Sequence, residues 1–286
     1  VQLGLSSNVD LATFKRRALN AAIVLDHSGS MASEKMEAAK AAADKLIELL
    51  DENDVLTIVE FDDTSRVVVG PVAVTDKAML HARVAGIHAQ GSTCIECGLR
   101  DGFAKLAQAK DSARANRLFL FTDAQPNVGS TSADDFMTQL TSAAAQELYV
   151  SIFGVGLDFG QELTTQISAV RGANARFLAT PEETQKVFDE DFDLLVTPIA
   201  WDLTFTVTPA APLTVSHVYG VPGEAAATFT STVKTVFLSR RRGALLVQLD
   251  GVLPETGALG TVQLGWSPLE GERREATVSV ERAEGA

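Results

Sequence analysis

The sequence predicts an α/β protein with an open, doubly wound and mostly parallel sheet, followed by a smaller all-β domain. Between residues 21 and 197, short runs that are apolar throughout alternate with longer stretches of helical periodicity. Strands that are apolar on both faces and joined by helices form parallel sheets that are covered on both sides. After Pro198 apolar and polar residues alternate instead, which is typical of half-buried strands in a β-sandwich.

The first strand and helix are the clearest elements. Ala21-Ala-Ile-Val-Leu-Asp26 is apolar up to its final carboxylate, and apolar residues then recur at steps of three and four from Met36 to Leu50. The run at 66–69 follows a strand too closely for a crossover helix, so it should pair antiparallel at an edge. Counting that edge, six strands are predicted, at 21–26, 55–61, 66–69, 117–123, 148–154 and 176–179. Further helices are predicted at about 76–87, from the loop at 90–93 to about 109, at 132–146, at 162–170, and from Pro181 to Pro198.

The chain is predicted to form two domains. Alternating runs after Pro198 lie at 201–207, 213–218, 244–249, 261–266 and 276–280. Val1-Gln-Leu-Gly-Leu5 alternates in the same way, so we expect the N-terminal strand to return to the β domain. The predicted organisation is therefore an N-terminal strand in residues 1–14 that joins the β domain, an α/β domain at 15–197, and the β-sandwich at 198–286. Trp201 and Trp266 are expected in the sandwich core.

Charge and composition narrow the class of function. The formal net charge is −13, and residues 198–286 carry 7 Lys/Arg and 9 Asp/Glu, so −11 falls on residues 1–197. An acidic body of this kind disfavours nucleic acid and anionic membrane and suits cation binding. The apolar runs are much shorter than the roughly 18 residues that span a bilayer, so no membrane insertion is expected. No signal peptide is visible, which, with Cys94 and Cys97 interpreted as free thiols, favours a cytoplasmic location.

The informative constellation is Asp26-His-Ser-Gly-Ser30, which lies between the first strand and its helix. In open α/β sheets ligands bind at the carboxyl ends of the strands. Asp26, Ser28 and Ser30 stand at alternating positions and can present three oxygens to one point. Thr93, behind Gly91 in a second loop, and Asp123, at the end of another strand, should reach the same edge. The five candidate metal ligands are Asp26, Ser28, Ser30, Thr93 and Asp123.

Two carboxylates and three hydroxyls are hard oxygen donors. They suit one divalent cation, Mg²⁺ first and Mn²⁺ or Ca²⁺ next, rather than Zn²⁺. Neutral hydroxyls leave much of the charge of such an ion uncompensated. The ion would therefore attract an anionic sixth ligand, either water or the carboxylate of a partner.

Asp-x-Ser-x-Ser after the first strand, a later Gly-x-Thr loop and a strand that ends in Thr-Asp resemble the metal-ion-dependent adhesion site of von Willebrand factor A domains. The resemblance covers about residues 15–197 and includes Phe153-Gly-Val-Gly-Leu-Asp158 as the turn after the fifth strand. It implies direct ligation by Ser28, Ser30 and Thr93, with Asp26 and Asp123 acting mainly through water. The appended β domain is similar in layout to bacterial members and to the heavy chains of inter-alpha-trypsin inhibitor. In this sequence Ser92 and Ala124 stand where Gly is common, and the two cysteines are unusual.

Each residue also has a simpler interpretation. An Asp or Ser in such a loop often caps a helix, so a metal-free A domain is an alternative. Regular helical geometry does not bring two sulfurs three residues apart into a bridge, so we expect Cys94 and Cys97 to be buried thiols, with redox sensitivity beside the metal loop as the alternative. His27 is either packed or on a rim that faces a partner. Arg240-Arg-Arg242 and the acidic stretch 182–193 are interpreted as solvated surface.

The function predicted from these residues is binding, not catalysis. A cation at the head of the sheet would complete its coordination with an Asp or Glu of a protein partner. A structural or assembly role for the sandwich or the acidic surface is the alternative. A hydrolase is disfavoured because a phosphatase with an aspartyl nucleophile wants a second acid where Ser28 stands.

Overall fold

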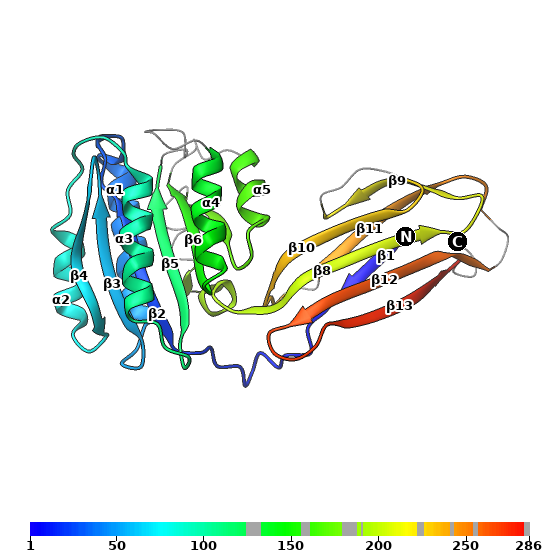
Figure 1. Ribbon diagram of the computed structural model, residues 1–286, viewed down its shortest axis with the longest axis horizontal. Helices are drawn as coiled ribbons and strands as arrows, with labels where there is room; N and C mark the ends of the chain where they lie inside the picture. The colour runs from blue at the N-terminus through cyan, green and yellow to red at the C-terminus, as the bar shows by residue number, and fades with distance from the viewer. Residues whose placement is uncertain are drawn as a thin grey trace. The chain divides into compact units, whose positions relative to one another are not determined.

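A computed structural model describes residues 1–123, 133–155, 161–178, 188–189, 191–221, 226–240, 243–253 and 257–282. The chain divides into two compact units (Figure 1). One unit contains residues 15–196, and the other combines residues 1–14 with 197–286. Among the described residues, no helix is long and apolar enough to cross a membrane.

The first unit is built on a six-stranded sheet with the order β4-β3-β2-β5-β6-β7. All neighbouring strands are parallel except β4, which pairs antiparallel with β3. This arrangement confirms the predicted α/β fold class. The strands are β2 (Leu19–Asp26), β3 (Val55–Phe61), β4 (Ser65–Ala73), β5 (Ala115–Thr122), β6 (Leu148–Val155) and β7 (Asn174–Leu178). The helices are η1 (Gly29–Met31), α1 (Glu34–Leu49), α2 (Lys77–Ala85), α3 (Ile95–Gln108), α4 (Ala133–Ala144) and α5 (Gln161–Ser168).

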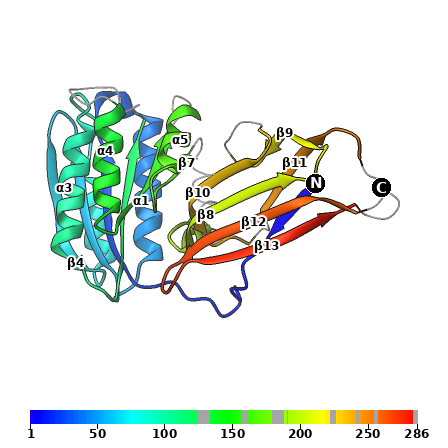
Figure 2. The same ribbon diagram turned by 45° about the vertical axis from the view of Figure 1, so that its right-hand side comes forward.

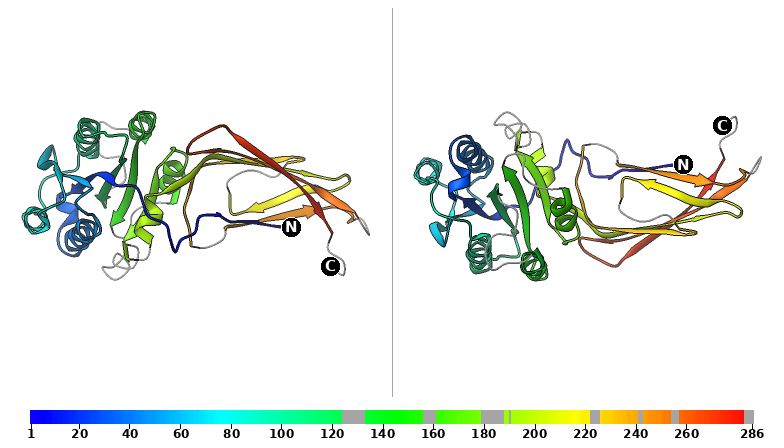
Figure 3. Two further views of the ribbon diagram at one scale, coloured as in Figure 1. Left: turned by 90° about the horizontal axis from the view of Figure 1, so that it is seen from below. Right: turned by 90° about the horizontal axis from the view of Figure 1, so that it is seen from above.

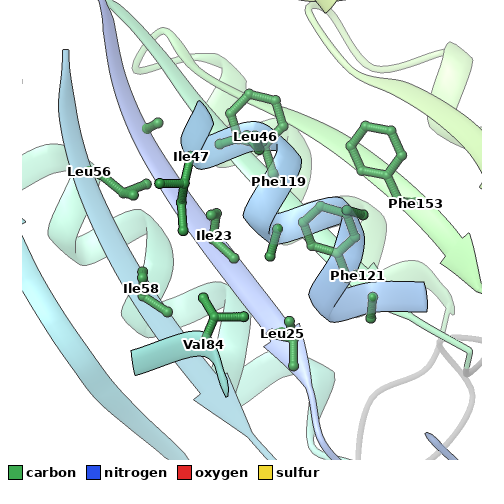
Figure 4. Close-up of a cluster of buried hydrophobic side chains, with 14 of the residues drawn as sticks. Ile23, Leu25, Leu46, Ile47, Leu56, Ile58, Val84, Phe119, Phe121 and Phe153 are labelled. Atoms are coloured by element: carbon green, nitrogen blue, oxygen red, sulfur yellow. The ribbon is translucent and has the colours of Figure 1, made fainter. Parts of the chain in front are cut away.

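Helices cover both faces of this sheet, as Figure 3 shows from either end. One core places α1 and α2 against Ile23, Leu25 and Phe119 (Figure 4), and Phe188 and Phe192 belong to the same core. The other core places α3 and α4 against the opposite side chains of the same strands. Because β2 is buried along its whole length, its polar last residue, Asp26, is held at the rim of two cores.

Two glycines bring α3 unusually close to the sheet. A Cβ atom at Gly98 would lie 2.5 Å from Phe61 Cδ1, and one at Gly102 would lie 2.6 Å from Val24 Cγ2. The two positions are four residues apart and therefore share one helix face. This close approach places the start of α3, and the loop that precedes it, against the carboxyl edge of β2 and β3.

The second unit contains two antiparallel sheets, with strand orders β1-β11-β9 and β10-β8-β12-β13 (Figure 2). Apolar side chains from both sheets form one small core. The N-terminal strand β1 pairs with β11 from the distant end of the chain. The strands are β1 (Gln2–Leu5), β8 (Pro198–Pro209), β9 (Thr214–Tyr219), β10 (Phe229–Phe237), β11 (Gly243–Asp250), β12 (Ala258–Pro268) and β13 (Arg274–Glu281).

The structure differs from the sequence prediction in several places. Strand β10 was not predicted, because its sequence is rich in Thr and carries a weak apolar alternation. Trp201 is buried and Trp266 is half-buried, but neither belongs to the apolar cluster that forms the core of the second unit, so they do not have the predicted place in that core. The predicted helix start at Pro181 and the turn residues 156–158 lie outside the described residues, as do Ala124 and Arg241–Arg242.

Candidate functional site

The site is centred on the loop that follows β2. Asp26 ends this strand with no exposed surface. Its Oδ1 accepts a hydrogen bond of 2.9 Å from the Ser28 backbone N–H, and its Oδ2 accepts one of 2.6 Å from the Thr122 hydroxyl on β5. The first bond closes a tight turn, and the second joins two neighbouring strands. The Asp26 carboxylate is therefore fixed in orientation by its own loop and by β5.

A chain of hydrogen bonds links the remaining residues of this loop to Asp123. The Ser28 and Ser30 hydroxyl oxygens lie 3.1 Å apart, and the Ser30 hydroxyl donates to Asp123 Oδ1 at 2.9 Å. The Lys35 ammonium, from the first turn of α1, donates to Asp123 Oδ2 at 2.5 Å. The Asp123 side chain is only 3% exposed. Four of the five predicted ligands, Asp26, Ser28, Ser30 and Asp123, are thus brought together.

The fifth predicted ligand, Thr93, lies half-buried in a loop that is held against the first. The Gly29 N–H donates to the Gly91 carbonyl at 3.0 Å, and the Gln90 N–H donates to the His27 carbonyl at 2.6 Å. Gly91 has a φ of 69°, a left-handed conformation that favours glycine. A Cβ atom there would also meet the Asp62 carboxylate at 3.0 Å, so this position needs glycine for two reasons.

The site contains two buried acids, Asp26 and Asp123, and one ammonium group, that of Lys35. Burial raises the pKa of Asp26, and the nearby Asp123 carboxylate raises it further, although hydrogen bonds from Thr122 and Ser28 act in the opposite direction. Among the described residues, the Lys35 side chain supplies a positive charge to Asp123. A second positive charge at the site would relieve the repulsion between the two carboxylates.

These residues fit a divalent cation. The buried side-chain oxygens of Asp26, Ser28 and Asp123 are all hard donors, and Ser30 presents its hydroxyl from an exposed position. His27 does not join this donor set. Its side chain is 6% exposed, and its Nδ1 lies 3.0 Å from the His88 carbonyl oxygen. Of the two interpretations of His27, the structure therefore favours a packed side chain over one on a rim that faces a partner.

The prediction of free thiols was wrong, because Cys94 and Cys97 form a disulfide. The prediction assumed that both cysteines lie within a regular helix. Cys94 instead precedes α3 as its N-cap, with φ −109° and ψ 78°, and only Cys97 lies in the helix. The two Cα atoms are 5.3 Å apart, within the normal range for a bridge. The two cysteines therefore do not favour a cytoplasmic location.

Sequence reasoning missed two residues that contact the candidate ligands. Thr122 was noted as part of the Thr-Asp strand end but was given no role, and its hydroxyl binds Asp26. Lys35 gave no signal beyond its place in the first turn of α1, because nothing in the sequence says that its side chain reaches back to Asp123.

An open α/β sheet with polar loops gathered at its carboxyl edge defines a large class of ligand-binding proteins. Within that class the chain belongs to the von Willebrand factor type A domain family, whose model matches residues 20–190. The predicted resemblance is thereby confirmed for the fold and the family.

Relatives with similar sequences occur in bacteria and in mammals. The uncharacterized protein sll0103 of Synechocystis sp. is 31% identical over 178 residues, which are 62% of this chain and 42% of that protein. Human inter-alpha-trypsin inhibitor heavy chain H3 is 30% identical over 150 residues, 49% of this chain and 17% of that protein. The chain spans less than half the length of these curated relatives.

Solved structures share the fold at low sequence identity. A von Willebrand factor type A protein from Catenulispora acidiphila covers 92% of this chain with a TM-score of 0.59 and 19% identity, and this chain covers 66% of it. The pilus adhesin SpaC of Lactobacillus rhamnosus GG covers 97% of this chain with a TM-score of 0.51 and 13% identity, and this chain covers 44% of it. Von Willebrand factor A domains are often protein-interaction modules, and this chain carries one.

Proposed function

We propose that this chain is a divalent-cation-dependent protein-binding module, and not an enzyme, in which the cation coordinates an Asp or Glu of the partner. The observation that carries the proposal is the hydrogen-bonded chain from Ser28 through Ser30 to Asp123, beside the buried Asp26. It gathers hard oxygens from two strand ends at one edge of the sheet. The proposed ligands are Asp26, Ser28, Ser30, Thr93 and Asp123.

The proposed ligands have two different roles in binding the cation. The hydroxyls of Ser28, Ser30 and Thr93 would bind the cation directly, whereas Asp26 and Asp123 would act mainly through water. Neutral hydroxyls leave most of the charge of the cation uncompensated, so the cation attracts an anionic ligand such as a carboxylate. Thr122 and the Ser28 N–H keep the Asp26 carboxylate oriented, because both donate to it.

A catalytic role has no comparable support. His27 is engaged with the His88 carbonyl at 3.0 Å, so its ring is not placed as the base for a serine nucleophile. Ser28, in turn, stands where an aspartyl phosphatase needs its second acid. Release of phosphate from generic phosphomonoesters would contradict this part of the proposal.

The first experiment is calorimetric titration of chelator-stripped protein with Mg²⁺ and with Mn²⁺. Two neighbouring hydroxyls provide a matched pair of variants, because Thr93 is a proposed ligand and the adjacent exposed Ser92 is not. Thr93→Ala and Asp26→Asn should lose uptake of one ion, whereas Ser92→Ala should retain it. Equal uptake by Thr93→Ala and Ser92→Ala would contradict the assigned ligand set. Thermal unfolding of each variant checks that the fold is intact.

The second experiment tests recognition of a carboxylate. A random heptapeptide library is panned on the protein in Mg²⁺, and bound peptides are released with a chelator. Peptides that carry Asp or Glu should be enriched, and replacing that residue with Asn or Gln should abolish binding. Enrichment that survives the chelator, or that ignores acidic residues, would favour an assembly role for other surfaces instead.

A further inference from the structure

The disulfide between Cys94 and Cys97 lies where the candidate metal loop meets α3. Thr93 is the residue immediately before it, and Cys94 is the N-cap of the helix. Both cysteines are half-buried rather than enclosed in the core. The bridge is therefore placed between a proposed ligand and a helix that packs closely on the sheet.

This bridge ties no distant parts of the chain together. It joins residues only three positions apart, so it closes a very small loop and restrains the unfolded chain little. Its effect falls on the backbone of residues 94–97. It holds Cys94 in a non-helical conformation although the Cys94 carbonyl already accepts the first helical hydrogen bond, from the Gly98 N–H at 3.3 Å. Because Cys94 follows Thr93 directly, a restraint on the Cys94 backbone also restrains the position of Thr93.

The position also suits thiol–disulfide exchange. Both cysteines are only half-buried at the start of α3, and a disulfide is the substrate of a dithiol.

The loop that holds Thr93 is fixed on both sides of this residue by backbone hydrogen bonds. On one side the Cys94 N–H donates to the Asp62 carbonyl at 2.6 Å, and on the other the Gly91 carbonyl accepts from the Gly29 N–H at 3.0 Å. The only covalent restraint on this loop, beyond the backbone, is the Cys94–Cys97 bridge. Opening the bridge would remove this covalent restraint from the residue next to Thr93, which would then be held by its backbone hydrogen bonds to Asp62 and Gly98 alone.

We propose that Cys94–Cys97 is a redox-active site that exchanges with a dithiol reductant, and that its oxidised form holds Thr93 in place for the cation. A thiolate of the reductant attacks one sulfur of the pair, the Cys94–Cys97 bond breaks, and a mixed disulfide forms. The second thiol of the reductant then displaces the protein sulfur. Two electrons and two protons pass to the chain, which ends with two thiols, and the reductant ends as a disulfide. The link to the cation rests on the proposed function.

The exchange is tested on the native protein with dithiothreitol. Samples are quenched with acid at intervals, alkylated, digested, and the peptide that contains both cysteines is weighed by mass spectrometry. The native protein should be reduced without denaturant, at a rate within about tenfold of that measured in urea. Reduction that occurs only once urea has unfolded the chain would mean that the bridge is purely structural and would overturn the proposal.

The coupling is tested by titrating Mg²⁺ into the oxidised protein, the reduced protein and the double variant C94S/C97S. Reduction should weaken Mg²⁺ binding by at least about tenfold, and the double variant should match the reduced protein. The reduced protein keeps the native sequence, so the test does not depend on the variant folding. Equal binding in both redox states would overturn the coupling alone. No binding even in the oxidised protein would overturn the proposed function, while the alkylation result would still decide the exchange.

Discussion

The Lys35 ammonium lies 2.5 Å from Asp123 Oδ2, at the point where a divalent cation would compensate the same carboxylate. The Asp123 side chain is 3% exposed and that of Lys35 is 32% exposed, so the lysine reaches inward from the rim to a buried acid. The ammonium compensates the negative charge of Asp123, which would otherwise be buried without a positive partner. Lys35 and the proposed cation would therefore compete for Asp123.

We predict that Lys35→Met lowers the stability of the metal-free protein and increases its gain from Mg²⁺. Without the ammonium, the buried Asp123 keeps only neutral donors, at a cost of about 1–3 kcal/mol. Mg²⁺ would then meet no competing charge and bind about tenfold more tightly, since removing one nearby positive charge is worth about 1–2 kcal/mol at a partly screened site. Thermal unfolding at a series of Mg²⁺ concentrations measures both effects.

Lys40→Met is the matched control, because Lys40 is on the same helix and donates only to the Ala85 carbonyl at the surface. It should change neither the metal-free stability nor the Mg²⁺ response beyond about 0.5 kcal/mol. If Lys35→Met instead weakens Mg²⁺ uptake, the lysine helps to hold the cation site together and does not compete for it.

The first unit of the fold was predictable because its signals are strong and independent of distant contacts. β2 is apolar on both faces and β3 nearly so, which indicates a covered parallel sheet, and Asp26 is the polar residue that interrupts this pattern at a strand end. The spacing of Asp26, Ser28 and Ser30 placed three oxygens in one loop. The contact from Lys35 to Asp123 was not predictable, because it depends on the rotamer of a long flexible side chain.

The failures have physical causes of the same kind. The disulfide was excluded by assuming that the helix begins before Cys94, and an error of one residue at a helix start changes which sulfurs can meet. β10 is rich in Thr and lacks a regular apolar alternation, so its strand character arises from pairing with β8 rather than from hydrophobicity. Element boundaries and half-polar strands are decided by neighbours that a single sequence does not reveal.

A second prediction concerns the close packing of α3. Gly102→Ala would place a methyl group 2.6 Å from Val24 Cγ2 and 2.7 Å from Leu118 Cδ1, so the helix must move away from the sheet. We expect a loss of about 1–3 kcal/mol of unfolding free energy, in spite of the higher helix propensity of alanine. Gly86→Ala is the control, because a Cβ there has its nearest neighbour at 3.6 Å and the residue has helical dihedrals. Urea denaturation that gives equal stabilities for the two variants would show that α3 does not depend on this approach.

A third prediction concerns Arg117, which is 1% exposed in the middle of the sheet. Its guanidinium donates to the Ser151 hydroxyl at 2.9 Å and to the Gly172 carbonyl at 3.2 Å, and burial lowers its pKa to about 10. Arg117→Met keeps most of the volume but removes these charged donors, so we expect a loss of about 2–4 kcal/mol. Urea denaturation measures the loss, with Arg100→Met, 58% exposed on α3, as the control. A loss no greater than that of the control would mean that packing alone holds this position.

The last prediction is a pH dependence that arises far from the candidate site, where His81 of α2 lies between Asp44 and Glu48 of α1. Its two ring nitrogens each lie 2.6 Å from one of these carboxylates. Burial by itself lowers the pKa of His81, but hydrogen bonds to Asp44 and Glu48 outweigh it and raise the pKa above the ordinary value of 6.5. The hydrogen bond from His81 likewise lowers the pKa of Glu48.

A histidine whose pKa is raised on folding stabilises the fold fully below its unfolded pKa, and this contribution is lost as the pH rises through the folded value. His81→Gln should therefore lower the midpoint of thermal unfolding at pH 5.5, by about 1–3 °C for pairs that are partly exposed to solvent, and should have little effect at pH 9. Exposed His217 on β9, whose ring lies beside that of Tyr219, offers the control variant His217→Gln. A difference between wild type and His81→Gln that stays constant from pH 5.5 to pH 9 would show that the α1–α2 contact is held by packing, and that the charge on His81 contributes nothing.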